Sequence, residues 1–171
     1  LSGCIRLGNG SRILPGTVIE GPVVIGPNSQ IGPNAYIRGA TSIGANCYVG
    51  NGAEVKNSIV YNNTYISRQC YVGDSIIGTH VTLGAGTCTE NHRHDGRHHV
   101  SMIQGKPVNT GRLKLGAILG DGVRTRRRRQ RDLLRRRDNI RHVRIFGLPQ
   151  RRRHANVDRV HLRHPRKIAR R

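Results

Sequence analysis

The sequence is poor in the side chains that organise most globular cores. Its 171 residues include no tryptophan, one phenylalanine and one methionine, and aromatic residues make up only 4%. This scarcity disfavours a layered globule built around large aromatic anchors. Glycine, by contrast, occurs 22 times. The composition therefore favours a narrow fold that is filled by aliphatic side chains and has glycine at its corners.

The spacing of the cysteines and the length of the apolar runs argue against disulfide-rich, metal-binding and membrane-spanning proteins. The four cysteines form no C-x-x-C pair, and three of them (Cys47, Cys70 and Cys88) lie in a repetitive region where small residues are needed. We predict reduced thiols that pack as small hydrophobes, not a disulfide or metal framework. No apolar run approaches the roughly 20 residues of a membrane span, and the first residues lack a signal-peptide pattern. We expect a soluble, cytoplasmic protein with no membrane partner.

The formal charge of +21 is concentrated at one end of the chain. Residues 126–171 hold 19 Lys/Arg against three Asp, whereas residues 1–125 hold 11 against six acidic residues. Three interpretations of this arginine-rich tail stay open: a nucleic-acid-binding arm, a helix around 132–146 that caps the fold, or a frameshifted reading. The absence of interleaved aromatic residues disfavours a nucleic-acid partner, and we favour the frameshift, which the coding DNA tests.

Aliphatic side chains recur every six residues along the first half of the chain. A helix would need a period of 3.6 and an ordinary strand a period of two, so a period of six requires a coil with flat sides. Each hexad supplies a short inward-pointing strand and a turn, and glycine after the aliphatic residue is expected to relax the backbone. After two five-residue steps the register resumes; the aliphatic positions are Leu7, Ile13, Ile19, Ile25, Ile31, Ile37, Ile43, Val49, Val55, Val60, Ile66, Val72, Ile77 and Leu83.

The predicted fold is all-β: a parallel β-helix of hexapeptide repeats with one loop excursion and an irregular or partly helical basic tail. We expect the β-helix over 1–125, with hexads at about 5–90, the excursion at about 91–112 and the last hexads at about 113–125. The tail would cover 126–171. Burying some fourteen aliphatic side chains, at about 1.5–3 kcal/mol each, is sufficient to order such a shaft.

Ordered motifs narrow the family. The stretches 53–59 (AEVKNSI), 71–74 (YVGD), 84–87 (GAGT) and 111–117 (GRLKLGA) resemble the acetyltransferase region of bifunctional glucosamine-1-phosphate acetyltransferases, in particular the archaeal sugar-1-phosphate nucleotidylyltransferase branch. The resemblance covers about 5–125. It implies a left-handed β-helix, a homotrimer, acetyl-coenzyme A as co-substrate along later coils, and a nucleotidylyltransferase domain upstream of Leu1. The alternative is that this shortened form binds no co-substrate.

The same resemblance assigns substrate-binding residues. It places Arg38, Lys56 and Tyr71 where the family holds the phosphate and sugar of the acceptor, and Asn91 where an amide contacts that sugar. A guanidinium and an ammonium beside a phenol suit a phosphomonoester dianion. The other interpretation of Arg38 and Lys56 is that they are solvated corner residues.

The catalytic base is not assigned. The family's histidine, three residues before the tyrosine of the Tyr-x-Gly-Asp motif, is Arg68 here, and a guanidinium cannot accept a proton. His80, His92 and His94 are the remaining candidates. His92, His94, His98 and His99 are as dense as a metal site, but they lie in a polar, arginine-containing loop, so we predict no metal.

Two functions therefore stand. The leading hypothesis is an acetyltransferase that moves acetyl from acetyl-coenzyme A to an amino-sugar 1-phosphate such as glucosamine 1-phosphate, in nucleotide-sugar biosynthesis. The alternative is a non-catalytic trimerisation or regulatory β-helix of a sugar-1-phosphate nucleotidylyltransferase, which Arg68 favours.

Overall fold

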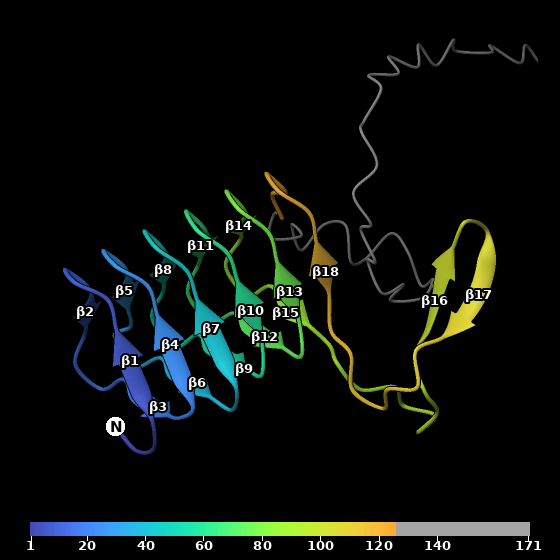
Figure 1. Cartoon of the computed structure of the whole chain (residues 1–171), viewed down its shortest axis with the longest axis horizontal. Helices are drawn as coiled ribbons and strands as arrows, with labels where there is room; N and C mark the ends of the chain where they lie inside the picture. The colour runs from blue at the N-terminus through green and yellow to red at the C-terminus, as the bar shows by residue number, and fades with distance from the viewer. Residues whose placement is uncertain (126–171) are drawn as a thin grey trace, which may run out of the picture.

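Short strands stack into three parallel sheets that enclose a narrow shaft (Figure 1). The computed structural model describes residues 1–125, so the predictions for the tail at 126–171 lie outside the described residues. Within residues 1–125 the structure has strands and turns but no helix, and therefore no helix that could cross a membrane. The predicted parallel β-helix is confirmed.

Each sheet takes every third strand of the shaft. The β1 sheet contains β1 (Ile5–Leu7), β4 (Val23–Ile25), β7 (Thr41–Ile43), β10 (Ile59–Val60), β13 (Ile76–Ile77) and β18 (Ile118–Leu119). The β2 sheet contains β2 (Arg12–Ile13), β5 (Gln30–Ile31), β8 (Tyr48–Val49), β11 (Tyr65–Ile66) and β14 (Thr82–Leu83). The β3 sheet contains β3 (Val18–Glu20), β6 (Tyr36–Arg38), β9 (Glu54–Lys56), β12 (Tyr71–Gly73) and β15 (Cys88–Thr89).

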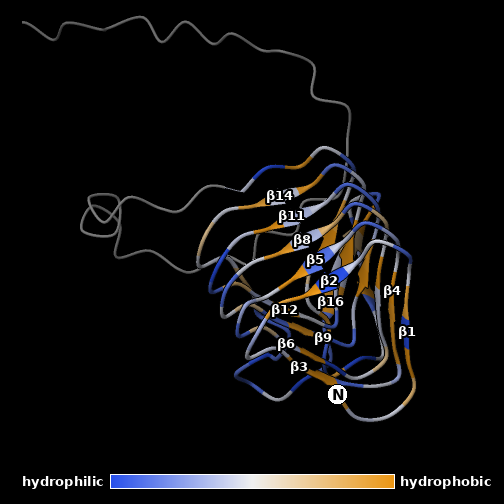
Figure 2. Ribbon diagram, turned by 90° about the vertical axis from the view of Figure 1, so that its left-hand side faces the viewer, coloured by the Kyte–Doolittle hydropathy of each residue, from blue (hydrophilic) through white to orange (hydrophobic). Residues whose placement is uncertain are grey.

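The hexad aliphatics fill the shaft in stacked columns. Along the β3 sheet, for example, Ile19 pairs with Ile37, Ile37 with Val55, and Val55 with Val72. These side chains are fully buried. In Figure 2 the orange, hydrophobic segments of the ribbon recur along the strands of the shaft. Leu7, at 46% exposure, and the partly buried Ile13 are exceptions, because both belong to the first described coil and have a neighbouring coil on one side only.

Glycine after the aliphatic residue has a different role from the one predicted. A Cβ on Gly26 would lie 2.6 Å from the backbone carbon of Gly44, and a Cβ on Gly8 would lie 2.3 Å from the nitrogen of Pro27. Those glycines permit close stacking of coils. Apart from Gly32, which has φ of 93°, the described glycines that follow a hexad aliphatic residue have no positive φ. Positive backbone angles occur instead at the corners, where a column of Asn28, Asn46, Asn63 and His80 has φ of 54–57°.

The chain leaves the shaft after β15 and returns at β18. Residues 91–117, which we call the excursion, carry an antiparallel hairpin of β16 (Val100–Ile103) and β17 (Lys106–Asn109). The hairpin projects from the shaft in Figure 1. The return is tight: the Gly116 amide donates to the Asp74 carbonyl at 2.9 Å, and a Cβ on Gly116 would meet the Gly73 carbonyl oxygen at 2.1 Å.

Two of the four cysteines pack as predicted. Cys47 and Cys70 are buried and Cys4 and Cys88 are exposed, and all four are free thiols. Burial raises the pKa of the Cys47 and Cys70 thiols, which keeps them protonated and unreactive. Cys88 differs because it occupies an outward position of β15, next to Tyr71 of β12.

Candidate active site on the β3 sheet

The outer face of the β3 sheet brings the predicted acceptor-binding residues onto neighbouring strands. Arg38 of β6 pairs with Lys56 of β9, and Lys56 pairs with Gly73 of β12. Tyr71 lies on the same face, two residues before Gly73, and Asn91 follows β15 closely. Side chains alternate between the two faces of a strand, so residues beside inward Ile37, Val55 and Val72 must point outward.

Arg38 is held in place by its neighbours. Its Nε and Nη2 donate to Glu54 Oε1 at 2.9 and 2.7 Å, and its Cζ lies 5.2 Å from the centre of the Tyr36 ring. The hydrogen bonds that Arg38 donates to Glu54 raise the pKa of Arg38. Glu54 also neutralises part of the charge that an anionic substrate would use, so Arg38 is well ordered but its ion pair offers an anion less net positive charge than the sequence alone indicates.

Lys56 is the cation of this face that remains available. It is half-buried and, among residues 1–125, forms no ion pair. The carboxyl groups of Glu20, Glu54 and Asp74 lie along the same stretch of the shaft, so the face as a whole is close to neutral. Any phosphate bound here would depend mainly on Lys56.

Tyr71, Asn91 and Asp74 form one hydrogen-bonded cluster. Asn91 Nδ2 donates to the Tyr71 hydroxyl at 3.2 Å and to Asp74 Oδ2, and Asn57 Nδ2 donates to Asp74 Oδ1 at 2.6 Å. Burial, and then the charge of Glu54, raise the pKa of the Tyr71 phenol. Tyr71 therefore stays protonated at neutral pH and can donate its hydroxyl hydrogen to a substrate oxygen.

Gly73 lets Tyr71 adopt this position. A Cβ on Gly73 would lie 2.6 Å from the Tyr71 hydroxyl oxygen and 2.8 Å from ring carbons. The Tyr71 ring therefore lies over Gly73 of the same strand, in space that the Cβ of any other residue would occupy. Gly73 orients the phenol without contacting a substrate itself.

His99 fixes the start of the excursion. Its ring is buried, and Nε2 lies 3.0 Å from the carbonyl oxygen of Asn91, while its own amide donates to Arg112 O at 2.8 Å. His99 contacts the Asn91 backbone, and the Asn91 side chain donates to the Tyr71 hydroxyl, so His99 helps to position the donor of that hydrogen bond. The sequence grouped His99 with three neighbouring histidines, whereas in the structure its ring supports the position of Asn91.

The base candidates are spread out. Arg68 is exposed in the turn before β12, and His80 sits in the corner column of asparagines between the β1 and β2 sheets, away from this face. His92 and His94 are exposed on the excursion, one and three residues after Asn91. Within residues 1–125 no three His, Cys, Asp or Glu side chains are arranged to hold a metal ion.

Several residues of this face were missed by sequence reasoning. Tyr36 and Glu54 stand one position before inward Ile37 and Val55, so the hexad pattern itself placed them outward beside Arg38 and Lys56. That parity could have identified them. The contact between His99 and Asn91 could not be predicted in this way, because the sequence of the excursion has no repeat.

The family follows from a comparison with known proteins. Residues 19–129 match the model of the GMPPB C-terminal domain. The chain belongs to this family. Among curated relatives, GlmU of Methanococcus maripaludis, described as a bifunctional protein, is 48% identical over 73 residues, covering 43% of this chain and 18% of that protein. The bifunctional sugar-1-phosphate nucleotidylyltransferase/acetyltransferase of Sulfurisphaera tokodaii is 43% identical over 72 residues, covering 42% and 18%.

Two further likenesses extend over more of the chain. A putative acetyltransferase of Escherichia coli, YaiX, is 37% identical over 123 residues, covering 72% of this chain and 54% of that protein. The acetyltransferase domain of PglB from Neisseria gonorrhoeae superposes with a TM-score of 0.51 at 17% identity, covering 67% and 45%, and supports the fold alone. The chain thus spans about a fifth of the length of the bifunctional relatives.

Proposed function

We propose that this GMPPB C-terminal domain transfers acetyl from acetyl-coenzyme A to the amine of an amino-sugar 1-phosphate such as glucosamine 1-phosphate. The observation that carries the proposal is the continuous outer face on which Lys56, Tyr71 and Asn91 lie together. Lys56 would hold the phosphate, and the Tyr71 hydroxyl and the Asn91 amide would bind sugar oxygens. The acetyltransferase names of several relatives support the reaction class.

The chemistry requires a base as well as acceptor-binding groups. The acceptor amine attacks the thioester carbonyl, the thiol leaves, and the nitrogen must lose a proton to a base. Arg68 cannot accept it, because a guanidinium stays protonated in proteins. His92 and His94, which follow Asn91 on the excursion, are the described histidines closest in sequence to the acceptor cluster and are the candidates for this role.

Self-association is part of the proposal. The outward positions of the β1 sheet form a row in which Ile59, Ile76 and Ile118 are adjacent and 39–45% exposed. An uncovered row of branched apolar side chains on a flat sheet favours packing against a second copy of this chain. A homotrimer built on this face would bring excursions and β3 faces of neighbouring copies together.

Acetyl transfer is tested by thiol release from acetyl-coenzyme A in the presence of glucosamine 1-phosphate. Lys56→Ala should raise KM for the acceptor about tenfold, since one charge-assisted contact contributes about 1.5 kcal/mol. Arg12→Ala is the matched control, because Arg12 is exposed on the β2 sheet. An equal KM for Lys56→Ala and the parent protein would contradict the assignment.

A non-catalytic assembly domain is the second candidate. It is favoured by Arg68, which is exposed and which the resemblance places at the position of the family's base. Arg68→His separates the two. A gain of thiol release would indicate that the site lacks only its base. No turnover by either protein, together with an intact oligomer in light scattering, would favour the assembly function.

A further inference from the structure

Two corners of the shaft are built on the same tripeptide, Gly-Asn-Gly. Residues 8–11 (GNGS) and residues 50–53 (GNGA) each follow a hexad aliphatic residue. In both turns the amide of the last residue donates to the carbonyl of the first, at 3.3 and 3.2 Å. The asparagine is exposed in both, and the second glycine has a positive φ, 73° at Gly10 and 64° at Gly52. The two turns are therefore matched in local sequence and local geometry.

The turns differ in how they stack on neighbouring coils. The carbonyl of each asparagine accepts a hydrogen bond from a backbone amide of the following coil at 2.9 Å. In the second turn the Gly52 amide also donates to Pro33 O of the preceding coil at 3.2 Å. Gly10 belongs to the first described coil, and its amide donates to no group within residues 1–125. One hydrogen bond thus distinguishes two otherwise matched turns.

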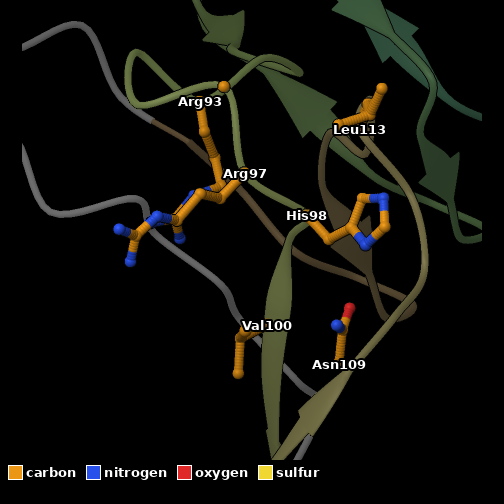
Figure 3. A pocket seen from close by; sticks show the side chains of 7 residues that line it. Arg93, Arg97, His98, Val100, Asn109 and Leu113 are labelled. Atoms are coloured by element: carbon orange, nitrogen blue, oxygen red, sulfur yellow. The ribbon is translucent and has the colours of Figure 1, made fainter.

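The two steps in which glycine follows aspartate resemble the second turn. The Gly122 amide donates to Thr79 O at 2.8 Å, and the Gly96 amide donates to Arg93 O at 3.1 Å. Figure 3 shows Arg93 and Arg97 on the turn that contains Gly96. Among residues 1–125, Gly10 is therefore the one glycine after asparagine or aspartate whose amide has no acceptor.

The glycine amide matters because it is the nucleophile that removes the side-chain amide of a preceding asparagine. Its nitrogen gives up a proton to solvent and attacks the asparagine Cγ. The Cγ–Nδ2 bond then breaks, and ammonia leaves with a proton from solvent. Water opens the resulting succinimide at either carbonyl and gives aspartate or isoaspartate. Glycine favours the attack because it has no Cβ to hinder the approach.

We propose that Asn9 is a site of spontaneous deamidation and that coil stacking protects Asn51 from the same reaction. Rotating the peptide that follows the asparagine breaks two coil-to-coil hydrogen bonds at Asn51 but one at Asn9. This difference of one hydrogen bond should make deamidation about threefold to tenfold faster at Asn9. The reaction is independent of the proposed acetyl transfer, because it needs no substrate other than water.

Deamidation would change the first coil in two ways. Aspartate adds a negative charge. Isoaspartate also routes the backbone through the former side chain, which lengthens the turn at the residue whose carbonyl accepts from the Asn28 amide. This turn joins β1 to β2, which pair with β4 and β5 of the second coil. We therefore expect the isoaspartyl form to pack less tightly on that coil.

The test is peptide mapping of the full chain after incubation in water enriched in heavy oxygen. Each deamidated site takes one oxygen atom from solvent, and trypsin places the two sites on different peptides, 7–12 and 39–56. In the folded protein Asn9 should react faster than Asn51 by the factor given above. In denaturant the two rates should become equal, because the flanking residues match. Asn9→Gln should remove the fast reaction and leave the rate at Asn51 unchanged.

Equal rates in the folded protein, a faster reaction at Asn51, or no reaction at either asparagine would overturn the proposal. Unequal rates in denaturant would also overturn it, since the flanking residues and not the stacking would then set the difference. Limited proteolysis of the incubated protein tests the effect on packing: it should cut within residues 1–20 faster than before incubation. The Asn9→Gln variant, incubated in parallel, should show no such change, and an equal change in both proteins would refute the effect on the first coil.

Discussion

The shaft and the excursion differ in both charge and side-chain burial. Residues 1–90 hold five Lys/Arg and four acidic residues, whereas the 27 residues of the excursion hold five and one. The shaft buries an inward aliphatic side chain on nearly every strand, but most hairpin side chains of the excursion are exposed. The regular part therefore provides a stiff frame, and the irregular part brings charge and imidazoles to it.

The two regions meet at one cluster. Asp74 belongs to a shaft corner, yet its carboxylate accepts from Asn91 and its carbonyl accepts from Gly116, so it contacts both ends of the excursion. His99 holds Asn91 from the other side. The geometry of the acceptor cluster is consequently set by both regions.

Gly26→Ala should have the largest effect, because it introduces a Cβ 2.6–2.9 Å from backbone atoms of Gly44 and Ala45 that cannot move without separating two coils. We expect a loss of about 2–4 kcal/mol in the free energy of unfolding, measured by denaturant titration. Gly105→Ala, at the open hairpin tip with φ of 78°, should cost only about 1 kcal/mol. Equal losses would break the distinction between frame and excursion.

His99→Phe should release the excursion while sparing the shaft. The ring would lose its contact with Asn91 O, which would keep only the hydrogen bond from the Leu115 amide, at a cost of about 0.5–1.5 kcal/mol. Limited proteolysis should then cut within 91–117 faster, and acceptor KM should rise more than kcat falls. His99→Gln, which keeps a side-chain donor, should recover part of both effects. Unchanged proteolysis and KM in His99→Phe would show that Asn91 is positioned without this ring.

The smallest effect concerns the last coil. Hydrogen bonds from the Thr79 side chain, and then from the Thr79 amide at 2.7 Å, lower the pKa of the Asp121 carboxyl in this coil. A depressed carboxyl pKa gives stability that is present above the ordinary value near 4 and is lost as pH falls through the folded value. The melting temperature should therefore drop slightly more below pH 4 in the parent than in Asp121→Asn. Identical pH profiles would mean that this contact adds nothing to the frame.

The hexads predicted the frame well because one physical requirement recurs at every sixth position. Inward Ile37 and Val55 pair in the expected register, and the five-residue steps to Val60 and Ile77 are absorbed at corners where Asn57 and Asp74 adopt positive φ. The role of glycine was misjudged, because coil-to-coil approach is a property of stacked neighbours and not of the local backbone.

The candidate site was only partly predictable. The row of Arg38 and Lys56 follows from strand parity, but the capture of Arg38 by Glu54 depends on a side-chain rotamer. The Tyr71 and Asn91 contact spans 20 residues and the excursion has no period, so no spacing rule reaches it. Site roles carried by such contacts stay predictions until the variants are measured.

The pairing of β18 with β13 has a kinetic consequence. Each earlier coil closes on a partner 17 or 18 residues away, as Ile76 does on Ile59, but Ile118 meets Ile76 only after 42 residues. Closing the longer loop costs about 0.8 kcal/mol more entropy than closing the shorter one. Folding should therefore propagate coil by coil through the shaft, with the final coil docking as a separate late step once the hairpin has formed.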